Sequence, residues 1–159
     1  MKVFRNIFPA LAGALLTAGT AVAAADNATS EHPVQTTTPV ENTMKIVIET
    51  DQQTLTATLL QDSAAARDFV ALLPLQLTLT DYAATEKISD LPGRLSTDGE
   101  PSGTAAKAGD ITYYAPWGNL AIFHKSFRHS AGLVKLGTLD NGVELMRSPG
   151  PLDVTIRLP

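Results

Sequence analysis

The sequence contains no cysteine and little charge, and both shortages restrict what the protein can be. Without cysteine the chain forms no disulfide, offers no thiol nucleophile and supplies no thiolate to a zinc site. Charged residues make up only 18% of the sequence, and 16 acidic residues face 12 basic ones. This balance argues against a nucleic-acid partner, which would require a basic surface. A hydrophobic share of 44% supports a core, so the 159 residues correspond to one globular domain with accessory segments.

Residues 1–25 have the three-part layout of a secretory signal peptide. Lys2 and Arg5 give a positive start, and an uncharged apolar run follows that offers Ala-x-Ala cleavage sites after Ala23 and Ala25. A retained membrane anchor is the alternative, but the second half of the run is Ala, Gly and Thr rather than Leu. We therefore expect a periplasmic or secreted protein without stable membrane insertion after cleavage.

Residues 26–43 are predicted to be a disordered linker, because they hold five Thr, two Pro and few apolar residues. From residue 44 the pattern changes. The segments 44–50 and 54–60 are rich in β-branched residues and alternate polar with apolar positions, which predicts a β-hairpin with one buried face. The domain is expected to span 44–159.

One helix is predicted over 64–73. Ala66, Phe69, Val70 and Leu73 recur at helical spacing and form one apolar stripe. Asp62 or Ser63 can cap the start, and Pro74 ends the helix. We expect this helix to cover an open side of a sheet or barrel.

The rest of the chain consists mainly of short predicted strands. These strands cover 75–80, 109–115, 120–125, 133–139 and 154–158, with an irregular or helical piece at 143–147. Residues 81–108 are predicted to be one long irregular connection that contains several Pro and Gly. About seven strands with frequent turns predict a mainly β domain, most simply a closed barrel or a sandwich.

Several local segments resemble a family of small bacterial proteins with a cyclophilin-like barrel. These are Leu72–Leu75, Asp81-Tyr82, Glu86–Ile88, the long run Gly109–Phe123, and Leu136-Gly137, of which the long run is the most specific. The resemblance spans about 44–158. It implies a mainly β fold, a closed cyclophilin-like β-barrel with one or two short helices and a groove on one face.

The resemblance also raises the possibility of peptidyl-prolyl isomerase activity. Cyclophilins carry an Arg after Phe-His and a Phe-x-x-Gln-Gly-Gly run, and the corresponding segment here, 85–92, has neither. Lys87 is the cation nearest to that Arg, but lysine lacks the planar fork that holds two acceptors. Arg94 would reach the groove only through a suitable loop fold. A weak isomerase acting on exported proteins is therefore the alternative hypothesis, and no catalytic residue is predicted.

Other chemistries find little support. His124 and His129 are five residues apart, match no zinc-ligand spacing and are expected to be exposed or hydrogen-bonded structural residues. No Gly-x-Ser-x-Gly motif is present. No metal site or cofactor is therefore predicted.

Aromatic residues point to a binding site. Tyr113 and Tyr114 must face opposite sides of a strand, so one is expected inside and the other beside a groove. Trp117 lies in a predicted turn, where a large ring either closes a barrel end or contacts a ligand. Apolar grooves with a few polar groups are typical of ligand sites. We predict a non-catalytic domain that binds a small molecule or peptide, with its oligomeric state left open. The predicted site comprises Tyr82, Glu86, Lys87, Trp117, Asn119 and Phe123.

Overall fold

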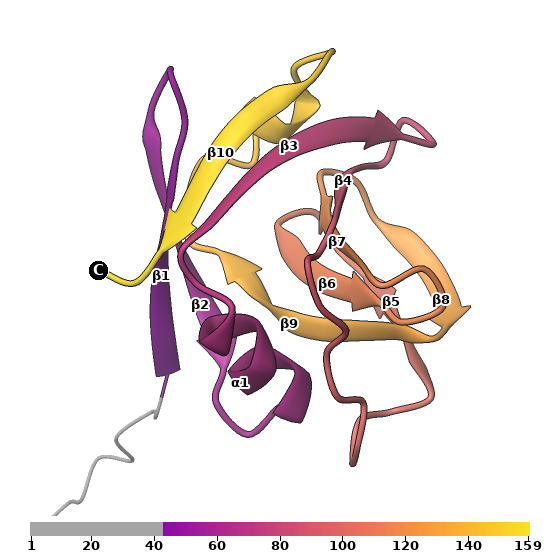
Figure 1. The fold of residues 1–159 in the computed structure, drawn as a ribbon. Helices are drawn as coiled ribbons and strands as arrows, with labels where there is room; N and C mark the ends of the chain where they lie inside the picture. Colours follow the sequence, from indigo (N-terminus) through magenta and orange to yellow (C-terminus); the bar gives the residue numbers. More distant parts are fainter. Residues whose placement is uncertain (1–42) are drawn as a thin grey trace, which may run out of the picture. The chain divides into compact units, whose positions relative to one another are not determined.

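The computed structural model describes residues 43–159, which form a closed antiparallel β-barrel with one α-helix (Figure 1). The barrel strands are β1 (Thr43–Glu49), β2 (Thr54–Leu60), β3 (Leu75–Tyr82), β4 (Glu86–Asp90), β6 (Asp110–Tyr114), β7 (Asn119–Phe123), β9 (Leu133–Leu139) and β10 (Leu152–Arg157). They close in the order β1-β10-β3-β4-β7-β6-β9-β2. The predicted fold class is confirmed. The predicted leader, 1–25, and nearly all of the predicted linker, 26–43, lie outside the described residues, and β1 begins one residue before the expected boundary at 44.

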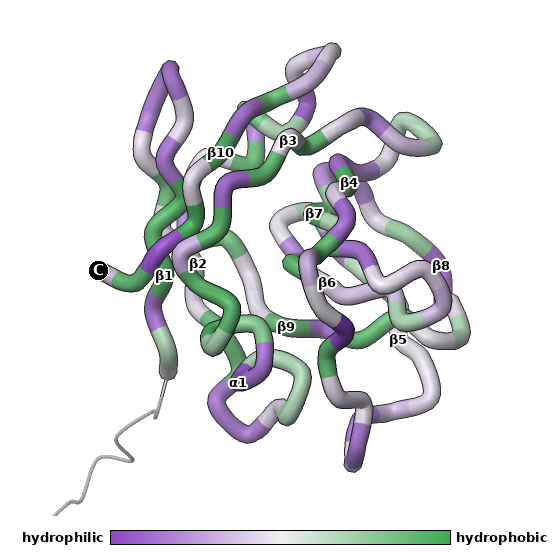
Figure 2. Tube along the Cα trace, in the orientation of Figure 1, coloured by the Kyte–Doolittle hydropathy of each residue, from purple (hydrophilic) through white to green (hydrophobic). Residues whose placement is uncertain are grey.

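Alternation along the strands fills the barrel interior. Figure 2 shows hydrophobic and hydrophilic residues alternating along β10, where Leu152, Val154 and Ile156 are buried. Their counterparts on the other strands complete one contiguous core. Gly137 allows β9 to lie very close to β2, because a Cβ there would stand 2.8 Å from the Cα of Leu59. Within 43–159 no helix has the length and apolarity that crossing a membrane requires.

The helix α1 (Ala64–Ala71) packs against the core through Phe69, which is fully buried. Of the two predicted caps, Ser63 is the one used, since its hydroxyl accepts a hydrogen bond of 3.0 Å from the backbone N–H of Ala66. The helix ends three residues before Pro74. A short 3₁₀ helix, η1 (Leu145–Arg147), lies in the segment predicted to be irregular or helical.

Residues 81–108 are more regular than predicted. They contain the end of β3, all of β4 and the strand β5 (Gly103–Ala106), which pairs with β8 (Phe127–Ala131), another strand absent from the prediction. The sequence of β4 conceals its strand because both faces are covered, so that Glu86 and Lys87 are polar yet buried. Alternation of polar and apolar residues identifies a strand that has one face in water, and a short apolar run identifies one covered on both faces; the polar residues of β4 fit neither pattern.

The two-stranded β5–β8 sheet covers part of the outer wall of the barrel beside β6 and β7 (Figure 1). A second apolar cluster lies at this place, formed by Ala106, Ala121, Phe123 and Leu133 with Ile88, Tyr114 and Phe127 packed against it. The outward-facing residues of β4, β6 and β7 are therefore shielded from solvent there. This shielding positions the candidate site.

Candidate functional site

A pocket of about 150 Å³ opens on the outer wall of the barrel. Its floor is formed by outward-facing residues of β4 and β7, and β8 contributes a further side through Phe127 and Ser130. Five aromatic side chains line it: Tyr82, Tyr114, Trp117, Phe123 and Phe127. The remaining lining residues are Glu86, Ile88, Asn119, Ala121, Ser130 and Leu133.

Trp117 stands at the rim of this pocket on the turn between β6 and β7. The turn is closed by hydrogen bonds from the N–H groups of Trp117 and Gly118 to the carbonyl of Tyr114, at 3.2 and 2.8 Å. Gly118 has φ +77°, a conformation that favours glycine. The indole remains 55% exposed although it is large and apolar. The rings of Tyr82 and Tyr114 pack against it nearly at right angles, with interplanar angles of 90° and 82°.

Two polar side chains in the pocket have buried atoms without a hydrogen-bond partner among the described residues. These atoms are Oε2 of Glu86 and Oδ1 of Asn119, and the two residues are 9% and 2% exposed. Burial raises the pKa of the Glu86 carboxyl to about 7. An unpartnered buried polar atom costs about 1–3 kcal/mol, so a structure that keeps two in one pocket suggests that a ligand completes them.

The strand register places these polar groups at opposite ends of the floor. Glu86 pairs with Phe123 on β7, and Asn119 lies four residues before Phe123 on that strand. At about 3.3 Å per residue this separates them by about 13 Å along the strand. A ligand that contacts both must extend along the floor.

Five of the six residues predicted for the site line this pocket: Tyr82, Glu86, Trp117, Asn119 and Phe123. Lys87 does not, and the prediction needs correction there. Its side chain is fully buried on the other face of β4, where Nζ donates hydrogen bonds of 2.7 Å to Oδ1 of Asp81 and to the carbonyl of Gly150. Neighbouring residues on a strand face opposite sides, so Glu86 and Lys87 cannot both line one groove.

The two adjacent tyrosines divide as expected. Tyr113 points into the core, where its hydroxyl accepts a hydrogen bond of 3.3 Å from the N–H of Leu95, and Tyr114 lines the pocket. Phe127 and Ser130 were missed because β8 was not predicted. The only feature of the sequence that could have indicated them is the aromatic residue Phe127, which stands next to the polar segment 128–130.

A family model described as the cyclophilin-like family matches residues 48–157, which is most of the chain and nearly all of the barrel. The chain belongs to the cyclophilin-like family. It is also similar in structure to the hypothetical protein AF2241 from Archaeoglobus fulgidus, with a TM-score of 0.59 over 74% of this chain and 95% of that one. At 16% identity this similarity concerns the fold alone. No curated protein matches the sequence.

This cyclophilin-like barrel has no cationic side chain in its pocket, as far as the described residues go. Arg94 donates a hydrogen bond of 2.6 Å from Nη1 to the carbonyl of Ala115 and does not line the pocket. Lys87 is engaged on the other side of β4. The pocket therefore offers aromatic surface and a few uncharged or acidic polar groups, but no positive charge for an amide oxygen.

His124 lies outside this pocket, in a hollow with Lys125 and Arg147 near the turn between β3 and β4. The prediction that it is exposed or hydrogen-bonded differs from the structure, since it is 7% exposed and its Nδ1 has no partner. Burial, followed by the charge of Lys125, lowers its pKa, which keeps the ring neutral. His129 on β8 is exposed as expected.

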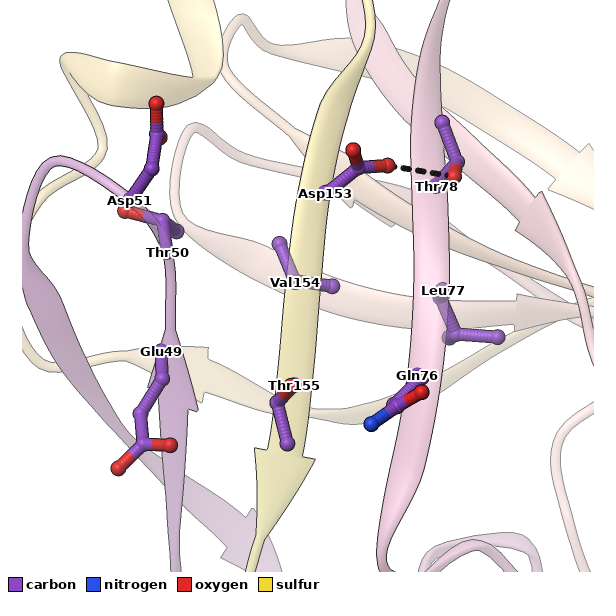
Figure 3. Close-up of a pocket in the computed structure, with 9 residues that line it drawn as sticks. All are labelled: Glu49, Thr50, Asp51, Gln76, Leu77, Thr78, Asp153, Val154 and Thr155. Carbon is purple, nitrogen blue, oxygen red and sulfur yellow. Dashed lines mark hydrogen bonds between the residues drawn. The ribbon is translucent and has the colours of Figure 1, made fainter.

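A wider hollow of about 430 Å³ lies over the outer faces of β1, β10 and β3 (Figure 3). Several of its polar groups already have partners: Thr78 donates a hydrogen bond of 2.6 Å to Asp153, and Glu49 pairs with Arg157 at 2.6 Å. It contains no aromatic ring and none of the unpartnered buried atoms. Despite its size, it has less that would orient a ligand than the aromatic pocket. Across 43–159 no group of three or more His, Asp or Glu residues is placed to hold a metal ion.

Proposed function

We propose that this chain is an exported, non-catalytic binding domain that holds the apolar part of a small molecule or peptide in its aromatic pocket. The observation that carries the proposal is the combination of five rings with the unpartnered buried oxygens of Glu86 and Asn119. Rings supply apolar contact, and the two polar groups give a ligand its orientation.

The size of the pocket limits the ligand part that it takes. A volume of about 150 Å³ is that of a cavity able to enclose one benzene-sized group. A larger ligand must therefore place one ring or side chain in the pocket and extend along the floor or past Trp117. An extended peptide covers the 13 Å (about four residues) between Asn119 and Glu86 at the usual rise of a strand.

Weak isomerase activity remains the alternative hypothesis, and no observation in the structure favours it. Cyclophilins place an Arg beside the twisted amide, and no cationic side chain of the described residues lines the aromatic pocket. We therefore propose binding without catalysis.

Export is proposed from the sequence of 1–25, with Lys2 and Arg5 ahead of the apolar run. Expression of the full chain in a bacterium with an export system tests it by the mass of the product. Removal of 23 or 25 residues supports the proposal. A product that retains the leader and stays in the membrane fraction overturns it.

Trp117 is the single tryptophan of the chain and stands at the pocket, so its fluorescence reports occupancy directly. The exported protein is titrated with neutral aromatic fragments and with four-residue peptides that carry one central apolar side chain, and binding is measured in parallel by calorimetry.

Trp117→Ala is expected to weaken binding by about tenfold, because it removes a large contact worth about 1.4 kcal/mol or more. Leu158→Ala is the matched control, since Leu158 is similarly exposed at 50% and lies outside the pocket. Equal binding by both variants and the wild type would place the site elsewhere.

A further inference from the structure

The ring geometry of the pocket suits a particular kind of ligand group. Tyr82 and Tyr114 stand nearly perpendicular to Trp117, so aromatic surfaces face the pocket region from different directions, and Phe123 and Phe127 add two more rings with centroids 5.6 Å apart. The face of each ring carries negative electrostatic potential, and tryptophan binds cations most strongly. Several such faces around one small volume stabilise a rounded cation better than a flat neutral ring.

The charge of the pocket lining also favours a cationic ligand group. Glu86 is the one carboxylate among its lining residues, and no Lys, Arg or His of the described chain lines the pocket. Asp81 and Lys87 form their ion pair at the other face of β4, and His124 lies in a different hollow. Glu86 thus has no counter-ion of its own.

The composition of the lining decides which cation fits. Ca²⁺ requires six to eight oxygen ligands, and a primary ammonium is strongly hydrated with three N–H groups to satisfy. Five of the eleven lining residues carry rings, and only one, Glu86, is a carboxylate. Methyl groups on the nitrogen remove the N–H donors and gain apolar contact with the rings. A trimethylammonium group is small enough for a volume of about 150 Å³.

We propose that the aromatic pocket binds a quaternary or methylated ammonium group, with the rings of Tyr82, Tyr114 and Trp117 around the methyl groups and the carboxylate of Glu86 as counter-ion. This inference rests on the proposed binding function and names the chemical class of its ligand. The group could belong to a free solute or to a methylated lysine in a peptide, and the two sources share this chemistry.

Choline and a short peptide with one trimethyllysine are the probes. Each is paired with a neutral carbon isostere in which a tert-butyl group replaces the trimethylammonium group, so that shape is kept and charge is lost. Calorimetry and Trp117 fluorescence on the exported protein are expected to show at least one cation binding about tenfold more tightly than its isostere. Which probe binds distinguishes a free solute from a peptide.

Glu86→Gln removes the counter-ion while keeping the shape of the side chain. We expect this variant to bind the cation more weakly, so that the ratio of the affinities for the cation and its isostere falls to less than half of the wild-type ratio. Glu144→Gln is the control, because Glu144 is an exposed residue outside the pocket that pairs with Arg147, and it should leave the preference unchanged.

The outcomes separate this inference from the proposed function. If cations and isosteres bind equally, or only neutral fragments bind, the pocket is a ligand site and the ammonium assignment is overturned. If neither the probes nor the neutral fragments and peptides bind, the proposed function is overturned with it.

Discussion

Replacing Glu86 by glutamine should make this protein more stable at neutral and alkaline pH. Burial raises the pKa of the Glu86 carboxyl from 4.5 to about 7, so the folded state retains a proton that the unfolded state has released. Because the folded state binds more protons in this range, stability falls as pH rises. The stabilisation that the protonated Glu86 gives to the folded state is fully present below about pH 4.5 and is lost as pH rises through about 7.

The size of the effect follows from the two pKa values. Between about pH 5 and pH 8, linkage predicts that the wild type loses about 2.5 kcal/mol through Glu86. Water that enters the open pocket reduces this figure, because it hydrates the ionised carboxylate. Glutamine does not titrate, so the free energy of unfolding of Glu86→Gln should exceed that of the wild type by an amount that grows by about 1–2.5 kcal/mol over the same interval.

Urea denaturation at several pH values measures this difference. Comparing variant with wild type cancels the opposite contribution of His124, whose lowered pKa makes stability rise with pH. Glu144→Gln is again the control, since Glu144 is exposed and its substitution should give curves parallel to the wild type. Parallel curves for Glu86→Gln would refute the argument that this carboxyl is buried without a partner.

Three further predictions concern the barrel and its chemistry. Lys87→Met should cost less than about 1.5 kcal/mol, because it keeps the buried volume and leaves the exposed Asp81 hydrated, whereas Lys87→Ala should cost about 3 kcal/mol through the cavity left behind. Equal losses in urea denaturation would contradict this reasoning. Gly137→Ala should cost about 3 kcal/mol, because its Cβ would overlap the carbonyl oxygen of Thr58, while Gly93→Ala, whose nearest neighbour is 3.7 Å away, should stay within about 0.5 kcal/mol. A thermal melt of both variants checks this, and similar melting points would refute the close approach. Finally, a protease-coupled assay with a proline peptide should show only the uncatalysed rate; faster turnover that scales with protein concentration would restore the isomerase hypothesis.

Strands with a regular residue pattern were predictable from the sequence. The hairpin β1–β2 and the strands β3, β6, β7, β9 and β10 all appear close to their expected positions, as does the helix capped by Ser63. Most of them alternate polar with apolar residues, and β6 and β7, which are buried on both faces, are short runs bounded by turn signals. The strands β4, β5 and β8 were missed. Their patterning is weak because β4 has polar residues in buried positions and β5 and β8 lie outside the barrel.

The candidate site was only partly predictable, for a related reason. Tyr82, Trp117 and Phe123 could be identified by type, because a large ring in a turn or beside a strand end is a candidate for ligand contact, and Glu86 and Asn119 were identified beside them, whereas Phe127 and Ser130 were not. The assignment of Lys87 was wrong for this pocket, because the sequence predicts an irregular segment where β4 lies, and only the strand reveals that Lys87 faces away from Glu86.

Local order in the chain was enough to establish that residues 44–159 alternate in short strands around a core, and which residue types were available to bind a ligand. The pocket itself required the closed barrel. Its floor joins β4 and β7, its rim comes from the end of β3 and the β6–β7 turn, and its remaining side comes from β8. These segments meet because barrel closure sets their register and the β5–β8 sheet excludes water from one part of the outer wall. Pairing between segments far apart in the sequence produces no residue pattern within any one of them. Only the tertiary structure therefore shows that Glu86 and Asn119 are buried with oxygen atoms that lack a hydrogen-bond partner.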